Sequence, residues 1–237
     1  MLDPTFHITT PRLHLSYLDP SNDAHMEYIA RLKNSPEMRA MEAQTPARFN
    51  PQPLTLSTAR AAQAAGAERL ERTGTGRYII SLRDPDRAFT EQQEREYVGT
   101  VSMQLQRFPD AVCPAVPDVG FALLAAYQGR GFAREACTAL MRYFSEVKGH
   151  VRFAGFTHPE NLASQKLFTR LGFENRGVRL VDGVVVSDGV GVEVAVWVKG
   201  VPEDVDLASL NIGSRRAVGL VAGCRGEEAD DLAVAGL

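Results

Sequence analysis

The amino-acid sequence predicts one mixed α/β domain. Between residues 12 and 198, segments that alternate apolar and polar side chains, as strands do, are interspersed with segments of helical period. Hydrophobic residues make up 44% of the 237 residues and charged residues 23%, which are globular values. A chain of this length can bury a core without disulfides or metals. The expected order is one strand, two helices, three strands, a helix, a strand, a helix and two strands.

The first strand and the first two helices follow from local patterns. Arg12 to Leu18 alternates apolar and polar residues and predicts a half-buried strand. The turn chemistry of residues 19–22 predicts the start of a helix that runs to about Lys33. Leu56 to Arg72 is alanine-rich and has high helix propensity. A polar, proline-bearing stretch, Ser35 to Pro53, separates the two helices.

Two strands come next, each followed by an irregular segment. Tyr78 to Leu82 and Tyr97 to Met103 are rich in β-branched and aromatic residues. The charged segment Asp84 to Glu96 between them is predicted to be a solvated loop, and Phe108 to Pro117, with three prolines, a second loop.

The second half begins with a strand, a glycine-rich turn and a helix. The strand is the apolar segment Val119 to Ala126, the turn is Gln128-Gly129-Arg130-Gly131-Phe132-Ala133, and the amphipathic helix is Phe132 to Val147. A strand from Val151 to Thr157 and a helix from about Asn161 to Leu171 follow, and Gly172 closes that helix.

The chain is predicted to end in a hairpin and a tail. The valine-rich segments Gly177 to Val186 and Val190 to Val198 flank the turn residues 187–189. Residues 201–237 mix glycine, alanine and acidic residues without a steady period, so we expect a domain over residues 1–200 and a flexible tail over 201–237.

The glycine-rich turn predicts a phosphate site. Gly129 and Gly131 leave backbone N–H groups uncovered, and the positive end of the helix dipole lies at the same place. An anion such as a diphosphate suits this geometry. A Rossmann dinucleotide loop also follows a strand, but Arg134 occupies the position of its third glycine and disfavours that reading. A purely structural turn is the remaining alternative.

Charge and cysteine usage restrict the class of protein. The formal net charge of −3 argues against a large nucleic-acid interface, which needs a basic excess. Cys113, Cys137 and Cys224 form no CxxC pair, which favours a reducing compartment. Since no signal peptide and no run of about 18 apolar residues occurs, we expect a cytoplasmic protein that does not bind a membrane. We also expect that it binds no nucleic acid and holds no metal.

Four patterns in the correct order resemble the GNAT superfamily of acyl-CoA-dependent N-acyltransferases, in the branch related to ribosomal-protein N-terminal acetyltransferases. The turn matches the family's Q/R-x-x-G-x-G/A phosphate loop, and Arg134-Glu135-Ala136 continues it. Asn161-Leu162-Ala163-Ser164 with Leu171-Gly172-Phe173 matches the second signature, and Thr10-Pro11-Arg12-Leu13-His14-Leu15 matches the opening strand. The resemblance spans roughly residues 9 to 199.

This resemblance implies the fold and the bound cofactor. It implies a central twisted, mostly antiparallel sheet of about six or seven strands flanked by helices, and an acyl donor such as acetyl-CoA. The pyrophosphate would bind the backbone N–H groups of Gly129, Arg130, Gly131, Phe132 and Ala133 in the loop that Gln128 opens. The pantetheine would run beside Leu123 and Ala125, and Asn161 would hydrogen-bond it.

The resemblance also implies two catalytic candidates. Asp118, just before Val119, would take a proton from the amine, directly or through water, and Ser164 would hydrogen-bond the departing sulfur. Many relatives have a tyrosine as general acid where this chain has Phe168, which cannot donate a proton. An N-acetyltransferase and a non-catalytic acyl-CoA-binding protein of the same fold therefore both stay open. So do the acceptor, a protein N-terminus or a small-molecule amine, and the oligomeric state, monomer or homodimer.

Overall fold

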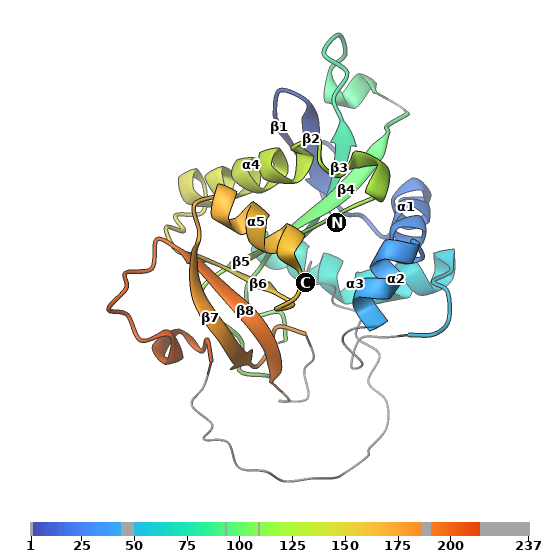
Figure 1. Cartoon of the computed structure of the whole chain (residues 1–237). Helices are drawn as coiled ribbons and strands as arrows, with labels where there is room; N and C mark the ends of the chain where they lie inside the picture. Colours follow the sequence, from blue (N-terminus) through green and yellow to red (C-terminus); the bar gives the residue numbers. More distant parts are fainter. Residues whose placement is uncertain (1, 44–49, 93, 109, 186–190, 214–237) are drawn as a thin grey trace.

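The structure is a computed structural model that describes residues 2–43, 50–92, 94–108, 110–185 and 191–213 (Figure 1). An open sheet of eight strands forms its centre, in the order β1-β2-β3-β4-β5-β6-β8-β7. Neighbouring strands are antiparallel except β5 and β6, which are parallel. The predicted mixed α/β domain with a mostly antiparallel sheet is confirmed.

The strands follow the predicted segments closely. They are β1 His7–Thr9, β2 Leu13–Tyr17, β3 Gly76–Leu82, β4 Tyr97–Gln104, β5 Asp118–Leu123, β6 Phe153–Thr157, β7 Glu174–Val181 and β8 Val192–Lys199. The sequence analysis missed β1, since three residues are too few to show an alternation. The predicted turn of the last hairpin, residues 187–189, lies outside the described residues.

Five α-helices and three short 3₁₀ turns are described. They are α1 Asp23–Lys33, α2 Pro36–Ala43, α3 Leu56–Thr73, α4 Phe132–Glu146, α5 Leu162–Arg170, η2 Phe89–Glu91, η3 Ala125–Tyr127 and η4 Leu207–Leu210. Side-chain caps begin α1 and α3: Asn22 Oδ1 accepts from the N–H of His25, and Thr55 forms a capping box with Thr58. The short helix α2 lies in the stretch where no helix was predicted.

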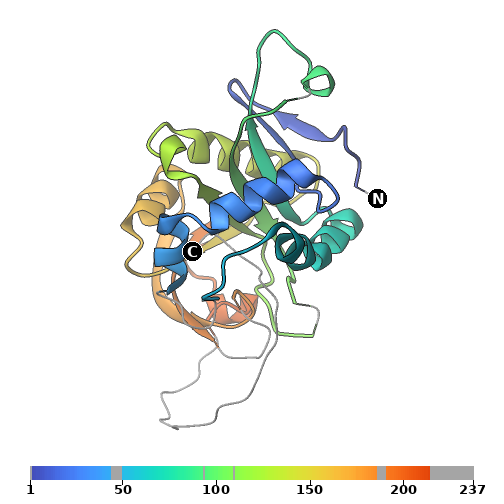
Figure 2. The same ribbon diagram turned by 90° about the vertical axis from the view of Figure 1, so that its right-hand side faces the viewer.

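Helices cover both faces of the sheet. On one face α4 buries Phe132, Leu140 and Phe144 against strand residues, and α5 buries Phe168. On the other face α1, α2 and α3 form a second apolar cluster. Figure 2 shows α1 lying across the strands on that side. The amphipathic stripe of α4 thus fixes the predicted turn to the sheet.

The sheet opens between its two parallel strands. β5 and β6 are joined only at Asp118 and Ala154, and within the described residues no further pair holds them together. Over residues 119–123, β5 pairs with β4 alone. Backbone groups of β5 that point away from β4 are therefore left without a sheet partner along this opening.

Part of the expected tail packs on the domain. Val201, Leu207 and Ile212 are buried against valines of β7 and β8. Residues 201–213 therefore belong to the folded body, because they cover an apolar face of the sheet. The rest of the expected tail, 214–237, lies outside the described residues.

Membrane spans and metal sites are both absent from the residues that the structure describes. In them, no helix is both long and apolar enough to cross a membrane, and no three His, Cys, Asp or Glu side chains gather as metal ligands would. Cys113 and Cys137 are buried free thiols, and burial raises the pKa of Cys137.

Candidate active site

A cavity of about 580 Å³ lies where β5, α4 and α5 meet. It brings together most of the residues that the sequence analysis selected: Leu123, Gln128, Gly129, Gly131, Phe132, Ala133, Asn161 and Ser164. The volume falls in the range of cofactor sites. Met38 and Met41 also line it, and the sequence analysis missed both because α2 was not predicted.

The loop before α4 presents unpaired backbone donors at the cavity wall. Gly129 and Gly131 have φ of +72° and +80°, conformations that glycine adopts without strain. The first bond of the helix runs from the N–H of Glu135 to the carbonyl of Gly131, at 3.1 Å. No acceptor among the described residues meets the N–H groups of Phe132, Ala133 and Arg134. Donors at the positive end of a helix dipole are an anion site.

A brace from the first strands holds this loop in place. Glu135 Oε1 accepts from Thr10 Oγ1 at 2.6 Å and from Arg12 N at 3.0 Å, while Oε2 accepts from Arg12 Nε at 2.7 Å. Arg12 Nη1 then donates to the carbonyl of Arg130 at 3.0 Å. Burial would raise the pKa of Glu135, but these hydrogen bonds outweigh it and lower that pKa. The sequence motifs containing Arg12 and Glu135 are therefore two halves of one brace, a contact that spacing alone did not reveal.

Two of the residues selected as cofactor ligands lie outside the cavity wall. Ala125 belongs to η3 and is exposed, since β5 ends at Leu123 rather than continuing to Ala126. The Arg130 side chain stacks over the ring of Phe132 at 4.9 Å, so its carbonyl is the atom that the brace uses. Of Arg130, only the backbone N–H therefore remains a candidate ligand of the pyrophosphate.

Three cations in the cavity wall were not selected from the sequence. Arg134 of α4 and Lys166 and Arg170 of α5 line it. Their charges add to the helix dipole and raise the local affinity for a polyanion. Charged residues on exposed helix faces are common, so their position around one cavity appeared only in the structure.

Asn161 and Ser164 meet the cavity from the start of α5. Asn161 Oδ1 accepts from the N–H of Ser164 at 3.0 Å and caps the helix. Its Nδ2 lies 3.9 Å from Met41 Sδ, a weak acceptor that leaves this donor available for a ligand. Ser164 is buried at the cavity wall. The cap and the ligand role of Asn161 are compatible, since they use different atoms.

Phe168 is a core residue. Its side chain is fully buried, and its ring lies 5.8 Å from that of Phe121 and 5.9 Å from that of Trp197. A Cβ added to Gly155 would lie 2.3 Å from the Phe168 ring, so the glycine admits the ring. At the position where many relatives have a tyrosine that donates a proton, this chain therefore has a phenylalanine that packs in the core.

Asp118 lies at the closed end of the opening between β5 and β6 and does not line the 580 Å³ cavity. Both of its oxygens accept from Arg107 Nη2, at 2.6 and 2.7 Å, and both side chains are buried. Arg107 Nη1 donates to the carbonyl of Val184 at 2.6 Å. Protonation of Asp118 would therefore weaken its charge-assisted hydrogen bonds with Arg107.

Comparison with known proteins agrees with this geometry. The model of the acetyltransferase (GNAT) domain matches residues 12–174, and the chain belongs to the GNAT acetyltransferase family. No curated protein matches it at a significant level.

Solved structures share the fold at low identity. An acetyltransferase from Salmonella typhimurium that modifies the N-terminal serine of a ribosomal protein is 18% identical, covers 83% of this chain and 100% of its own, and has a TM-score of 0.59. RimL, a ribosomal-protein α-N-acetyltransferase in complex with coenzyme A, is 18% identical over 82% of this chain and 97% of its own, with a TM-score of 0.56. The microcin C7 self-immunity acetyltransferase MccE, in complex with acetyl-CoA and AMP, is 16% identical over 84% and 97%, with a TM-score of 0.58. The family model thereby confirms the predicted GNAT family, and these solved structures share its fold.

Proposed function

We propose that the protein is an N-acetyltransferase that moves an acetyl group from acetyl-CoA to a primary amine in a ternary complex. The observation that carries the proposal is the row of unpaired N–H donors at the start of α4, which opens into a cavity of cofactor size. Two relatives of the same fold contain coenzyme A or acetyl-CoA, which supports acetyl-CoA as the donor.

The proposed position of acetyl-CoA follows from the cavity wall. The diphosphate binds the N–H groups of residues 129–133, and Arg134, Lys166 and Arg170 offset its charge. The pantetheine lies beside Leu123, along the edge of β5 that β6 leaves open, and accepts a hydrogen bond from Asn161 Nδ2. The thioester then lies near Phe121 and Ala122, at the inner end of the cavity.

The proposed reaction is direct attack. A neutral amine nitrogen forms a bond to the thioester carbon, and the unpaired N–H groups of β5 stabilise the tetrahedral oxyanion. The C–S bond then breaks, the amine proton leaves to water or to Asp118, and the thiolate is released as CoA. Ser164 donates a hydrogen bond to the departing sulfur. This help is sufficient because a thiol with a pKa of about 8.5 leaves readily near neutral pH.

A non-catalytic acyl-CoA-binding protein is the second candidate. It is favoured by two observations, the burial of Phe168 where relatives have a tyrosine and the pairing of both Asp118 oxygens with Arg107. The two candidates share the cofactor and differ only in turnover.

Thiol release separates them. Purified protein is incubated with acetyl-CoA and a panel of peptides, polyamines and amino acids, while calorimetry measures the Kd for acetyl-CoA. We expect CoA release with at least one class of amine. Tight binding of acetyl-CoA without release across the whole panel would instead establish the binding protein.

A variant of Ser164 tests its proposed role in catalysis. Ser164→Ala removes one hydrogen bond to a developing negative charge, so kcat should fall about tenfold while the Kd for acetyl-CoA changes less than twofold. Ser145→Ala, an exposed serine of α4 outside the cavity, is the matched control. An unchanged kcat would remove Ser164 from the mechanism.

A further inference from the structure

The helix that begins at the phosphate loop carries an acidic residue close to its start. Glu135 lies in the first turn of α4. Because Cα–Cβ bonds in a helix tilt toward its N-terminus, the Glu135 side chain extends back toward the loop. A free negative charge at this place would repel a diphosphate bound to the N–H groups of residues 132–134. The proposed cofactor site therefore requires that this carboxylate is held and that its charge is offset.

A free carboxylate here would also compete for the same donors. Helix N-termini attract acidic side chains, because the dipole and the unpaired N–H groups stabilise a negative charge. A glutamate near the start of a helix can fold back onto these groups, as it does in a capping box. In the part of the chain that the structure describes, the Glu135 oxygens accept from Thr10 and Arg12 rather than from the backbone of α4. The donors of the helix are thereby left for a ligand.

Arg12 supplies most of the groups that hold this carboxylate. Its backbone N–H and its Nε donate to Glu135 at 3.0 and 2.7 Å, and its Nη2 forms an ion pair with Oε2 at 2.7 Å. Its Nη1 donates to the carbonyl of Arg130 at 3.0 Å. One guanidinium group therefore offsets both the charge of Glu135 and the partial negative charge of a loop carbonyl.

Arg12 acts on the loop from outside the cavity. Neither Arg12 nor Glu135 belongs to the described residues that line the 580 Å³ cavity. A Cβ on Gly131 would lie 3.4 Å from Arg12 Nη2, and Arg12 Cζ lies 4.6 Å from the centroid of the Phe132 ring. The guanidinium group thus packs against the loop and against the first residue of α4 without lining the space where the cofactor is proposed to bind.

Burial gives the charge of Glu135 its weight. The Glu135 side chain is 16% exposed, whereas that of Arg12 is 48% exposed. Burial opposes the ionisation of Glu135, but the hydrogen bonds from Thr10 and Arg12 outweigh it and lower the pKa of this carboxyl. Water screens a mostly buried charge poorly, so removing the cation alone would leave a strong negative charge beside the loop.

We infer that Arg12 is a positioning residue for acetyl-CoA. It holds the carboxylate of Glu135 beside the start of β2 and offsets its charge, so the N–H groups at the start of α4 stay free for the diphosphate. This inference rests on the proposed function, because it assigns a residue that acts on the same cofactor site through the loop. Arg12 is needed because Glu135 is charged, and it does not touch the cofactor.

Two single variants and their double variant test the inference by calorimetry with acetyl-CoA at low ionic strength. Arg12→Gln leaves Glu135 charged and unpaired, so the Kd should rise about tenfold, which is the order of one unfavourable charge at a helix terminus. Glu135→Gln removes the negative charge, so its Kd should stay within about threefold of the unaltered protein. The double variant removes both charges and should bind acetyl-CoA more tightly than Arg12→Gln does.

A split between KM and kcat provides a readout that a loss of structure would not imitate. With an amine that the protein acetylates, Arg12→Gln should raise KM for acetyl-CoA about tenfold and leave kcat within about twofold, because Arg12 does not contact the reacting atoms. Arg12→Lys keeps a cation beside Glu135, so its Kd should lie below that of Arg12→Gln. Arg12→Met keeps the packing against Phe132 and replaces Arg12→Gln in both tests if the latter is unstable to urea.

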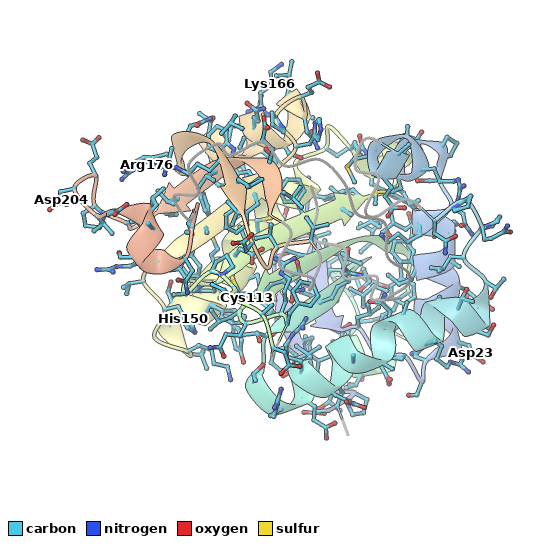
Figure 3. All side chains as sticks on the ribbon, turned by 90° about the horizontal axis from the view of Figure 1, so that it is seen from below. Asp23, Cys113, His150, Lys166, Arg176 and Asp204 are labelled. Carbon is cyan, nitrogen blue, oxygen red and sulfur yellow. The ribbon has the colours of Figure 1, made fainter. Side chains whose placement is uncertain are left out.

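The chain offers a matched control. Arg60 also bonds a carboxylate, that of Asp23, and a backbone carbonyl, that of Pro20, at 2.9 Å. Figure 3 shows Asp23 well apart from Lys166, which lines the cavity. Arg60→Gln should therefore leave the Kd for acetyl-CoA unchanged.

Two results would overturn the inference. One is an equal Kd for Arg12→Gln and Arg60→Gln. The other is a double variant that binds acetyl-CoA no better than Arg12→Gln, because Arg12 would then act by contact with the cofactor or by shape alone. If the unaltered protein binds acetyl-CoA but releases no thiol with any amine, the proposed catalysis is wrong, and the Kd values still decide the role of Arg12. If the unaltered protein binds no acetyl-CoA, the proposed function is wrong and this inference fails with it.

Discussion

The loop before α4 can be tested with one glycine and a matched control. Gly131→Glu adds a negative side chain where the diphosphate is proposed to bind. A Cβ at Gly131 would meet only Arg12 Nη2, at 3.4 Å, so the side chain has room to extend without breaking the core. The expected loss is therefore in ligand affinity more than in folding.

The magnitude follows from the geometry. A non-glycine residue at φ of +80° costs about 1–2 kcal/mol of stability. Two like charges about 4 Å apart repel by about 4 kcal/mol at an effective dielectric constant of about 20, which corresponds to nearly a thousandfold in Kd. Gly131→Gln, of the same size but neutral, should lose clearly less affinity than Gly131→Glu.

Gly149→Glu is the control for strain and charge. Gly149 has φ of +75°, no heavy atom lies within 4 Å of a Cβ built there, and it does not line the cavity. Calorimetry with acetyl-CoA at low ionic strength measures all three variants, and urea unfolding measures their stability. Equal affinity in Gly131→Glu and Gly149→Glu would refute the diphosphate site at the start of α4.

Three further changes test the rest of the structure. Asp118→Asn should lower the free energy of unfolding by about 3 kcal/mol, because it leaves Arg107 buried without its carboxylate. If the variant also loses the acidic limb of the pH–rate profile, Asp118 is the base. If the profile is unaltered, the role of Asp118 is restricted to holding Arg107. Burial lowers the pKa of His25 to about 4 from 6.5, so the unfolded chain binds its proton more readily, and stability is lost as the pH falls from 6.5 toward 4. Burial lowers the pKa of His14 to about 4 as well, so between pH 7 and 5 urea unfolding should show a loss that is about 2 kcal/mol larger in the unaltered protein than in His25→Gln. Gly155→Ala should destabilise the fold by about 1–3 kcal/mol or more, because its methyl would lie 2.3 Å from the Phe168 ring, and recovery of stability on adding Phe168→Leu would identify that contact as the cause.

Several features of the protein follow from the sequence alone because they are local. The glycine pair before α4 and the cap at Asn161 each depend on residues within a few positions of one another. The alternation in β2 located the strand but wrongly predicted a half-buried one, because neighbours cover both of its faces. The phosphate loop could be selected for the same reason, since its chemistry requires only backbone N–H groups and a helix that starts beside them.

The tertiary structure decided the features that join distant segments. Thr10 and Glu135 are 125 residues apart, and Arg12 and Arg130 are 118 apart, so no periodicity relates them. The partner of Asp118 and the wall of the cavity likewise depend on how the loop after β4, α2 and α5 pack on the sheet. Local propensity specifies which segments become helices and strands, whereas side chains meet across the sheet only after the whole core is packed.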